Sequence, residues 1–217
     1  MMLPSNRTFL ATSALIVVLA ANSQADLIPY PNPGHYNNAT YSFVADHDGD
    51  VVGYFAGSDA SYQNRVGLLV NGVLTSAGYG LDDHASSIGQ AFNFGRVRAG
   101  DVLVFDLWVI TLGSHVYSDP SMNAPFDSSG YSGGHNHLYA TPYTATSPVF
   151  GSTPPGMYVA FEDQRFPNTD YSYADENFVF TNVIRSVPEP PALTLVAVGL
   201  AALLGVFLPR LRGRYAS

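Results

Sequence analysis

Arg65-Val66-Gly67-Leu68-Leu69-Val70-Asn71-Gly72-Val73-Leu74-Thr75 is the stretch that decides the fold class. An Asn-Gly pair between two apolar runs favours the type I′ turn of a tight β-hairpin, because both central residues must adopt positive φ. The apolar residues on either side follow a period of two rather than 3.6, which is typical of strands. The stretch therefore predicts two antiparallel strands, 65–70 and 73–75.

The same period of two recurs along the chain. It appears at 41–44, at 51–55 and in the long segment 101–112, and each run is bounded by Gly, Asn, Asp or Pro. In the last of these, Val102, Val104 and Asp106 share one face and Leu103, Phe105 and Leu107 the other. No convincing amphipathic helix occurs between residues 26 and 186. Short, regularly spaced strands predict an all-β protein, a β-sandwich with jelly-roll-like topology.

Residues 114–153 differ from this pattern. They are rich in Ser, Gly, Pro, Tyr and His, and only 138–144 carries a strand signal. The segment is too long for a plain connection, which predicts a functional or mobile insertion. Its Tyr131, Tyr139 and Tyr143 could stack on sugar rings or fill a small core. His135 and His137 could hold zinc together with His115 or a nearby Asp, although histidine pairs are common in glycine-rich loops.

Composition limits the function. The chain has 17 acidic residues, all between Asp26 and Glu189, and no lysine at all. Such a surface repels nucleic acid and anionic lipid, so phosphate-backbone binding is excluded as a main function. Cysteine is absent, which excludes disulfides and thiol catalysis and leaves the core or bound ions to stabilise an extracellular domain. Of the acidic residues 14 are Asp, a turn former and also a ligand of hard cations.

The strongest chemical signal lies near the end of the domain, where Phe161-Glu162-Asp163 is followed by Asp170-Tyr171-Ser172-Tyr173-Ala174-Asp175-Glu176-Asn177-Phe178-Val179-Phe180. Like charges so close in sequence repel one another unless they are spread apart or bridged by a cation. Calcium is the natural cation outside the cell, and it takes oxygen ligands. We therefore predict calcium binding by Glu162, Asp163, Asp170 and Asp175. The alternative is a set of solvated strand ends.

These residues carry a resemblance to a family. An apolar strand ending in Glu-Asp, then an acidic Asp-Tyr segment and an aromatic strand, resembles the C-terminal signature of the DUF4114-type β-domain of bacterial secreted proteins. The chain departs from that signature at Ser172-Tyr173-Ala174, where a compact Asn-Asp is expected.

A second acidic segment, Asp46-His47-Asp48-Gly49-Asp50, has the alternating spacing of calcium loops. It is not an EF-hand, because the sixth position is Val51 and the twelfth is Gly57. We predict a weaker calcium site at Asp46, Asp48 and Asp50. The alternative is a polar turn between two strands.

The last residues predict a sorting signal. They run from Val187-Pro188-Glu189-Pro190 through an apolar run to Pro209, followed by Arg210, Arg212 and Arg214. The 17 apolar residues 192–208 are long enough for a helix that crosses a thin bilayer, and the arginines favour a cytoplasmic end. The order resembles the PEP-CTERM sorting signal of exported bacterial proteins. The resemblance implies recognition of residues 187–190 by an exosortase-type membrane protease.

The start of the chain predicts a secretory signal peptide. Arg7 precedes an apolar stretch, residues 9–21, and Ser23 and Ala25 have the spacing that signal peptidase favours. We expect cleavage after Ala25. The predicted organisation is a signal peptide (1–25), a β-sandwich domain (26–186) and a sorting signal with a transmembrane helix (187–217).

Catalytic signatures are missing. The chain has no Gly-x-Ser-x-Gly elbow, no phosphate loop and no His-Glu-x-x-His. The sequence therefore predicts an exported, non-enzymatic protein. It would be anchored transiently in the inner membrane and then released to the cell surface or extracellular matrix, in association with exopolysaccharide. A carbohydrate-binding module acting through the aromatic insertion is the alternative, and a secreted hydrolase a further one.

Overall fold

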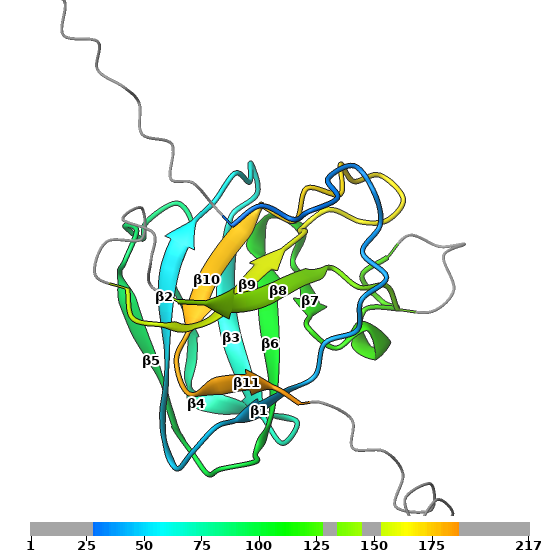
Figure 1. The fold of residues 1–217 in the computed structure, drawn as a ribbon. Helices are drawn as coiled ribbons and strands as arrows, with labels where there is room; N and C mark the ends of the chain where they lie inside the picture. Colours follow the sequence, from blue (N-terminus) through cyan, green and yellow to red (C-terminus); the bar gives the residue numbers. More distant parts are fainter. Residues whose placement is uncertain (1–27, 128–133, 145–152, 187–217) are drawn as a thin grey trace, which may run out of the picture.

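A computed structural model describes residues 28–127, 134–144 and 153–186 (Figure 1). The predicted signal peptide, the sorting signal with its transmembrane helix, and Tyr131 lie outside these residues. Within the described ranges, none of the helices is long and apolar enough to span a membrane.

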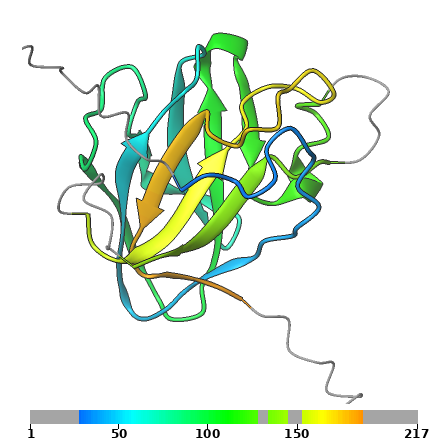
Figure 2. The same cartoon turned by 45° about the horizontal axis from the view of Figure 1, so that its top comes forward.

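The chain folds into two antiparallel β-sheets, as the period of two predicts. The first sheet has the order β11-β1-β6-β3-β4, with β7 also paired to β6, and the second has the order β5-β2-β10-β9-β8. The strands of the first sheet are β1 (Phe43–Ala45), β3 (Asn64–Val70), β4 (Val73–Gly80), β6 (Val102–Val109), β7 (Ser114–Tyr117) and β11 (Val183–Arg185). Those of the second are β2 (Gly49–Gly57), β5 (Ala91–Val97), β8 (Leu138–Tyr143), β9 (Gly156–Phe161) and β10 (Glu176–Phe180). Figures 1 and 2 show the second sheet lying over the first.

The Asn-Gly hairpin is confirmed. Asn71 and Gly72 have φ values of 50° and 82°, the positive pair that a type I′ turn requires, and Val70 lies opposite Val73. The hairpin joins β3 and β4, and β3 in turn pairs along its whole length with β6. The segment predicted as one strand from 101 to 112 is a strand only to Val109, and a single 3-10 turn, η1 (Ile110–Leu112), follows it.

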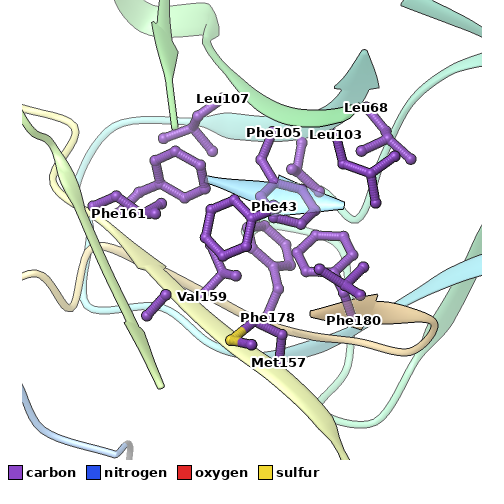
Figure 3. Packing of buried hydrophobic residues seen from close by; sticks show 14 of the residues in the cluster. Phe43, Leu68, Leu103, Phe105, Leu107, Met157, Val159, Phe161, Phe178 and Phe180 are labelled. Atoms are coloured by element: carbon purple, nitrogen blue, oxygen red, sulfur yellow. The ribbon is translucent and has the colours of Figure 1, made fainter. Parts of the chain in front are cut away.

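The two sheets enclose an aromatic core (Figure 3). Leu103, Phe105 and Leu107 of β6 are buried in it, as the alternation predicts, whereas Val102 at the start of the strand is 52% exposed. The rings of Phe105 and Phe180 stack across the sheets with their centroids 4.2 Å apart. Burial of aromatic side chains supplies the stability that a chain without disulfides needs.

The predicted insertion 114–153 contains more regular structure than its sequence indicates. It contributes β7, the 3-10 turn η2 (Pro120–Met122) and β8. The strand signal at 138–144 corresponds to β8, but β7 carried no signal because its four residues include a polar pair, Ser114 and His115. Tyr139 and Tyr143 lie on β8, in the second sheet, and cluster with Tyr158, Ala160 and Val179 of the neighbouring strands; Tyr143 is 4% exposed.

One end of the molecule holds the buried carboxylates Glu162, Asp163 and Asp175. The segment 162–175 connects β9 to β10 there, and residues 34–37 lie beside it (Figures 1 and 2), since Gly34 N donates to the carbonyl oxygen of Tyr171 at 3.3 Å. The side chain of Tyr173 is buried, and its hydroxyl oxygen accepts a hydrogen bond from Asn37 N at 2.9 Å. These contacts hold the connection against the domain and so fix the acidic residues within it.

Candidate metal centre

Three carboxylates converge where β9 ends and β10 begins. Glu162, Asp163 and Asp175, here called the acidic triad, each offer one oxygen atom, and these atoms lie within 4.8 Å of one another. All three side chains are buried, with residue exposures of 0%, 2% and 5%. The triad could hold a metal ion, because hard cations bind through buried carboxylate oxygens.

The backbone of the connection positions the triad. Asp175 N donates to the carbonyl oxygen of Phe161 at 3.1 Å, and Asp163 N donates to Asp175 Oδ2 at 2.9 Å. Glu162 N donates to the carbonyl oxygen of His137 at 2.9 Å. The two ends of the connection are thus tied to each other and to the segment preceding β8, so the carboxylates are held close despite their charges.

The Glu162 carboxylate is poorly satisfied within the described residues. Neither of its oxygens accepts a hydrogen bond within the part of the chain that the structure describes, and both are shielded from solvent. An ionised carboxylate in such a place carries a desolvation penalty of several kcal/mol unless it is paired. Burial raises the pKa of Glu162; side-chain contacts from Asp175 and Thr169 partly oppose the rise, and the charges of Asp170 and Asp163 add to it.

The pKa values of Asp163 and Asp175, the other two members of the triad, are also raised. Burial and the charge of Asp175 raise the pKa of Asp163 to about 7. Burial and the charge of Glu162 raise the pKa of Asp175 to about 8. None of the three pairs with an arginine in the described ranges. Either protons or a cation must compensate their charges.

Asp170, the fourth residue predicted for this site, is exposed and does not join the triad. Its carboxylate accepts a hydrogen bond from Ser172 N at 2.7 Å and so shapes the loop. The structure instead adds Glu176, Asn64 and Asp83, which the sequence analysis did not select. Glu176 could have been selected from its alternation with Phe178 and Phe180, which places it on the core side of β10.

Asp46, Asp48 and Asp50 are exposed and bind three different partners. Asp46 Oδ2 lies 3.2 Å from His47 Nδ1, Asp48 accepts from Ala99 N, and Asp50 accepts from the Asn93 side chain. The structure does not bring their carboxylates together as one group of ligands. These three residues lie before or at the start of β2, whereas the acidic triad lies near the last residue of that strand, where Asn177 pairs with Gly57. A strand of nine residues spans roughly 26 Å, so the two groups are far apart.

The histidine pair is used structurally. His135 Nδ1 and His137 Nε2 lie 3.0 and 2.9 Å from the two carboxylate oxygens of Asp127, and His137 Nδ1 lies 3.0 Å from the carbonyl oxygen of Glu162. Both nitrogens of the buried His137 ring are therefore engaged, and neither is left for zinc. His115 lies on β7 and bonds Asp106 instead.

No family model, no curated protein and no solved structure matches this chain.

Proposed function

We propose that this chain is an exported, non-enzymatic component of the cell surface or extracellular matrix, a jelly-roll-like β-sandwich whose acidic end is stabilised by calcium. The observation that supports a bound cation is the buried acidic triad, and above all Glu162, whose two oxygens make no hydrogen bond of good geometry among the described residues. A buried negative charge without a partner destabilises a domain, and a divalent cation supplies the missing charge. Outside the cell calcium is the hard cation at hand.

The export route is proposed from the sequence. Residues 1–25 would direct secretion, and residues 187–217 would hold the chain in the inner membrane until an exosortase-type protease acts at 187–190. The strongly acidic domain would then be released to the cell surface or matrix, where exopolysaccharide is the proposed associate. Calcium binding suits that destination, because a domain without disulfides gains stability there from the ion.

Thermal unfolding with and without calcium tests the proposal. Binding only to the folded state adds RT ln(1 + [L]/Kd), so millimolar calcium at a site of about 10 μM affinity contributes about 2.7 kcal/mol. For a domain of this size we expect the Tm to rise by about 5 to 10 °C, and magnesium to do much less. The substitution Asp175→Asn should reduce the rise, because it removes one ligand of the triad. Asp50→Asn, an exposed carboxylate at the other end of β2, is the matched control and should keep it. An unchanged Tm in the parent protein would overturn the calcium proposal.

A second candidate function, carbohydrate binding, is favoured by an aromatic row on the outer face of the first sheet. The row consists of Trp108 of β6 and His115 and Tyr117 of β7, all partly exposed. Their ring planes are nearly parallel: the centroids of Trp108 and His115 lie 6.2 Å apart, and those of His115 and Tyr117 6.1 Å apart. Asp106 beneath them orients His115 through a 2.9 Å contact to Nδ1. Aromatic rings of this kind can stack on sugars, although they differ from the tyrosines that the sequence analysis selected.

Trp108 makes this candidate simple to test, because it is the only tryptophan of the chain. Titration with polysaccharide fragments should change its fluorescence if sugar stacks on the row. A Trp108→Phe variant, followed by affinity electrophoresis, should bind more weakly. If the parent protein shows no fluorescence change and no retardation with any polysaccharide, the carbohydrate candidate is wrong.

A further inference from the structure

We infer that the acidic triad is one half of a two-ion centre, and that Asp163, Glu176 and Asn64 form a second calcium site, the inner site, between the two sheets. The inference rests on the proposed function, because Asp163 belongs to both halves. It extends the centre from the connection between β9 and β10 into the end of the core.

Glu176 points into the molecule. It is the first residue of β10, and Phe178 and Phe180, which alternate with it, lie in the core. The residue is 0% exposed, and in the described ranges neither carboxylate oxygen makes a hydrogen bond of good geometry, although the Asn64 side chain lies close enough to oppose part of the rise that burial causes in its pKa. A side chain of this type is almost never fully buried without a partner.

Asn64 reaches the same place from the opposite sheet. It is the first residue of β3, it alternates with the core residues Val66 and Leu68, and it is 0% exposed. Its Nδ2 donates to Asp163 Oδ2 at 2.8 Å, which joins the first sheet to the carboxylates of the second. Its Oδ1 is buried and has no donor among the described residues.

The unpartnered atoms at this end are all oxygens. They are Glu162 Oε1 and Oε2, Glu176 Oε1 and Oε2, and Asn64 Oδ1. With the carboxylates ionised, all five accept hydrogen bonds or bind cations, and none donates. A set of buried carboxylate and amide oxygens without nitrogen or sulfur ligands matches calcium rather than zinc.

The charge of the inner site also requires compensation. Asp83 lies beside it, with a side chain that is 0% exposed, and accepts from Asn64 N at 2.9 Å. Burial, followed by the charges of Asp83 and Asp163, raises the pKa of Glu176 well above its usual range. A proton on Glu176 would cancel one charge and could serve Asn64 Oδ1, and Asp83 has His84 Nε2 3.9 Å from its Oδ2, but the charge of Asp163 would remain without a cationic partner in the described ranges. A divalent cation compensates several of them at once and binds the free oxygens.

Counting bound ions tests the inner site. The full chain, purified in detergent and stripped of metal, is dialysed against calcium chloride, and bound calcium per chain is measured by mass spectrometry. We expect two ions in the parent protein. Glu176→Gln and Glu162→Gln should each retain one ion, and the double variant none. The remaining glutamate, Glu189, lies outside the described residues, and Glu189→Gln is the matched control that should retain two.

The outcomes separate this inference from the proposed function. One ion in the parent would overturn the inner site and leave the calcium proposal intact, with Glu176 then neutralised by a proton. No bound ion in the parent would overturn both. Two ions in the parent and two in a folded Glu176→Gln variant would place the second ion elsewhere and overturn the inference. Because the count in the parent needs no variant, the test stands even if Glu176→Gln fails to fold.

Discussion

Raising the pH should destabilise the domain when no metal is present, because the buried carboxylates then lose their protons. Asp163 in the folded state keeps its proton up to about pH 7, whereas in the unfolded chain it loses it near 3.8. Between pH 5 and pH 7 the folded state therefore binds more protons than the unfolded state. Under this condition the free energy of unfolding falls as pH rises.

The loss of unfolding free energy can be calculated for a single extra proton on the folded state. Each pH unit over which the folded state holds one extra proton costs about 1.4 kcal/mol, so two units give about 3 kcal/mol. Asp175, with a pKa of about 8, extends the fall to pH 8. The two carboxylates interact and titrate as a pair, so the figure for a single proton is the minimum expected.

Urea unfolding of the fragment 26–186 in metal-free buffers at pH 5, 6, 7 and 8, followed by circular dichroism, measures this dependence. Saturating calcium should flatten it, since the ion rather than the proton then neutralises the carboxylates. Asp175→Asn should reduce the fall, because it removes the charge that acts on Asp163. Asp50→Asn should leave the fall unchanged. Constant or increasing stability from pH 5 to pH 8 in the metal-free parent would refute the reasoning.

Three further predictions concern the core, the domain boundary and export. Phe105→Ala should destabilise the fragment by about 3 to 5 kcal/mol in urea unfolding, because it removes buried surface and leaves a cavity. Val102→Ala, at a half-exposed site, should cost far less, and equal losses would contradict the described core. The fragment 26–186 should be soluble and folded by circular dichroism, and an unfolded fragment alongside a folded full chain would show that the boundaries are wrong. Replacing residues 188–190 by alanine should block C-terminal processing, which mass spectrometry of the released protein detects; an unchanged C-terminus would exclude this role.

The fold class could be predicted because the signal is local. Asn71-Gly72 and the alternation around Phe105 depend only on neighbouring residues and solvent, so the hairpin and the inner face of β6 follow directly from them. Short strands are harder to predict from the sequence. β7 and β11 have four and three residues, and they form because β6 and β1 present hydrogen-bonding edges, which no local pattern reveals.

The candidate site was predicted in part for the same reason. Glu162, Asp163 and Asp175 are close in sequence to the strand ends that bring them together, so clustering could be expected. Asn64 enters from another sheet, about 100 residues earlier in the chain, and only the packing of β3 against the second sheet brings it to Asp163. Asp170 has the right chemistry, but a turn directs it to its own backbone instead.

The pairing of β11 with β1 has a mechanical consequence. Arg185 lies opposite Phe43, so the chain leaves β11 beside the point where it enters β1. A force applied beyond Ser186 and resisted at the start of β1 would load these hydrogen bonds one after another, as in opening a zipper, instead of shearing them together. Three residue pairs, the Ser186 N to Ser42 carbonyl bond and the contacts of the Arg185 side chain with the Thr40 carbonyl and the Tyr41 ring oppose this peeling. Under tension at its C-terminal end, the domain would release β11 first and uncover one edge of β1 while the remaining strands stay paired.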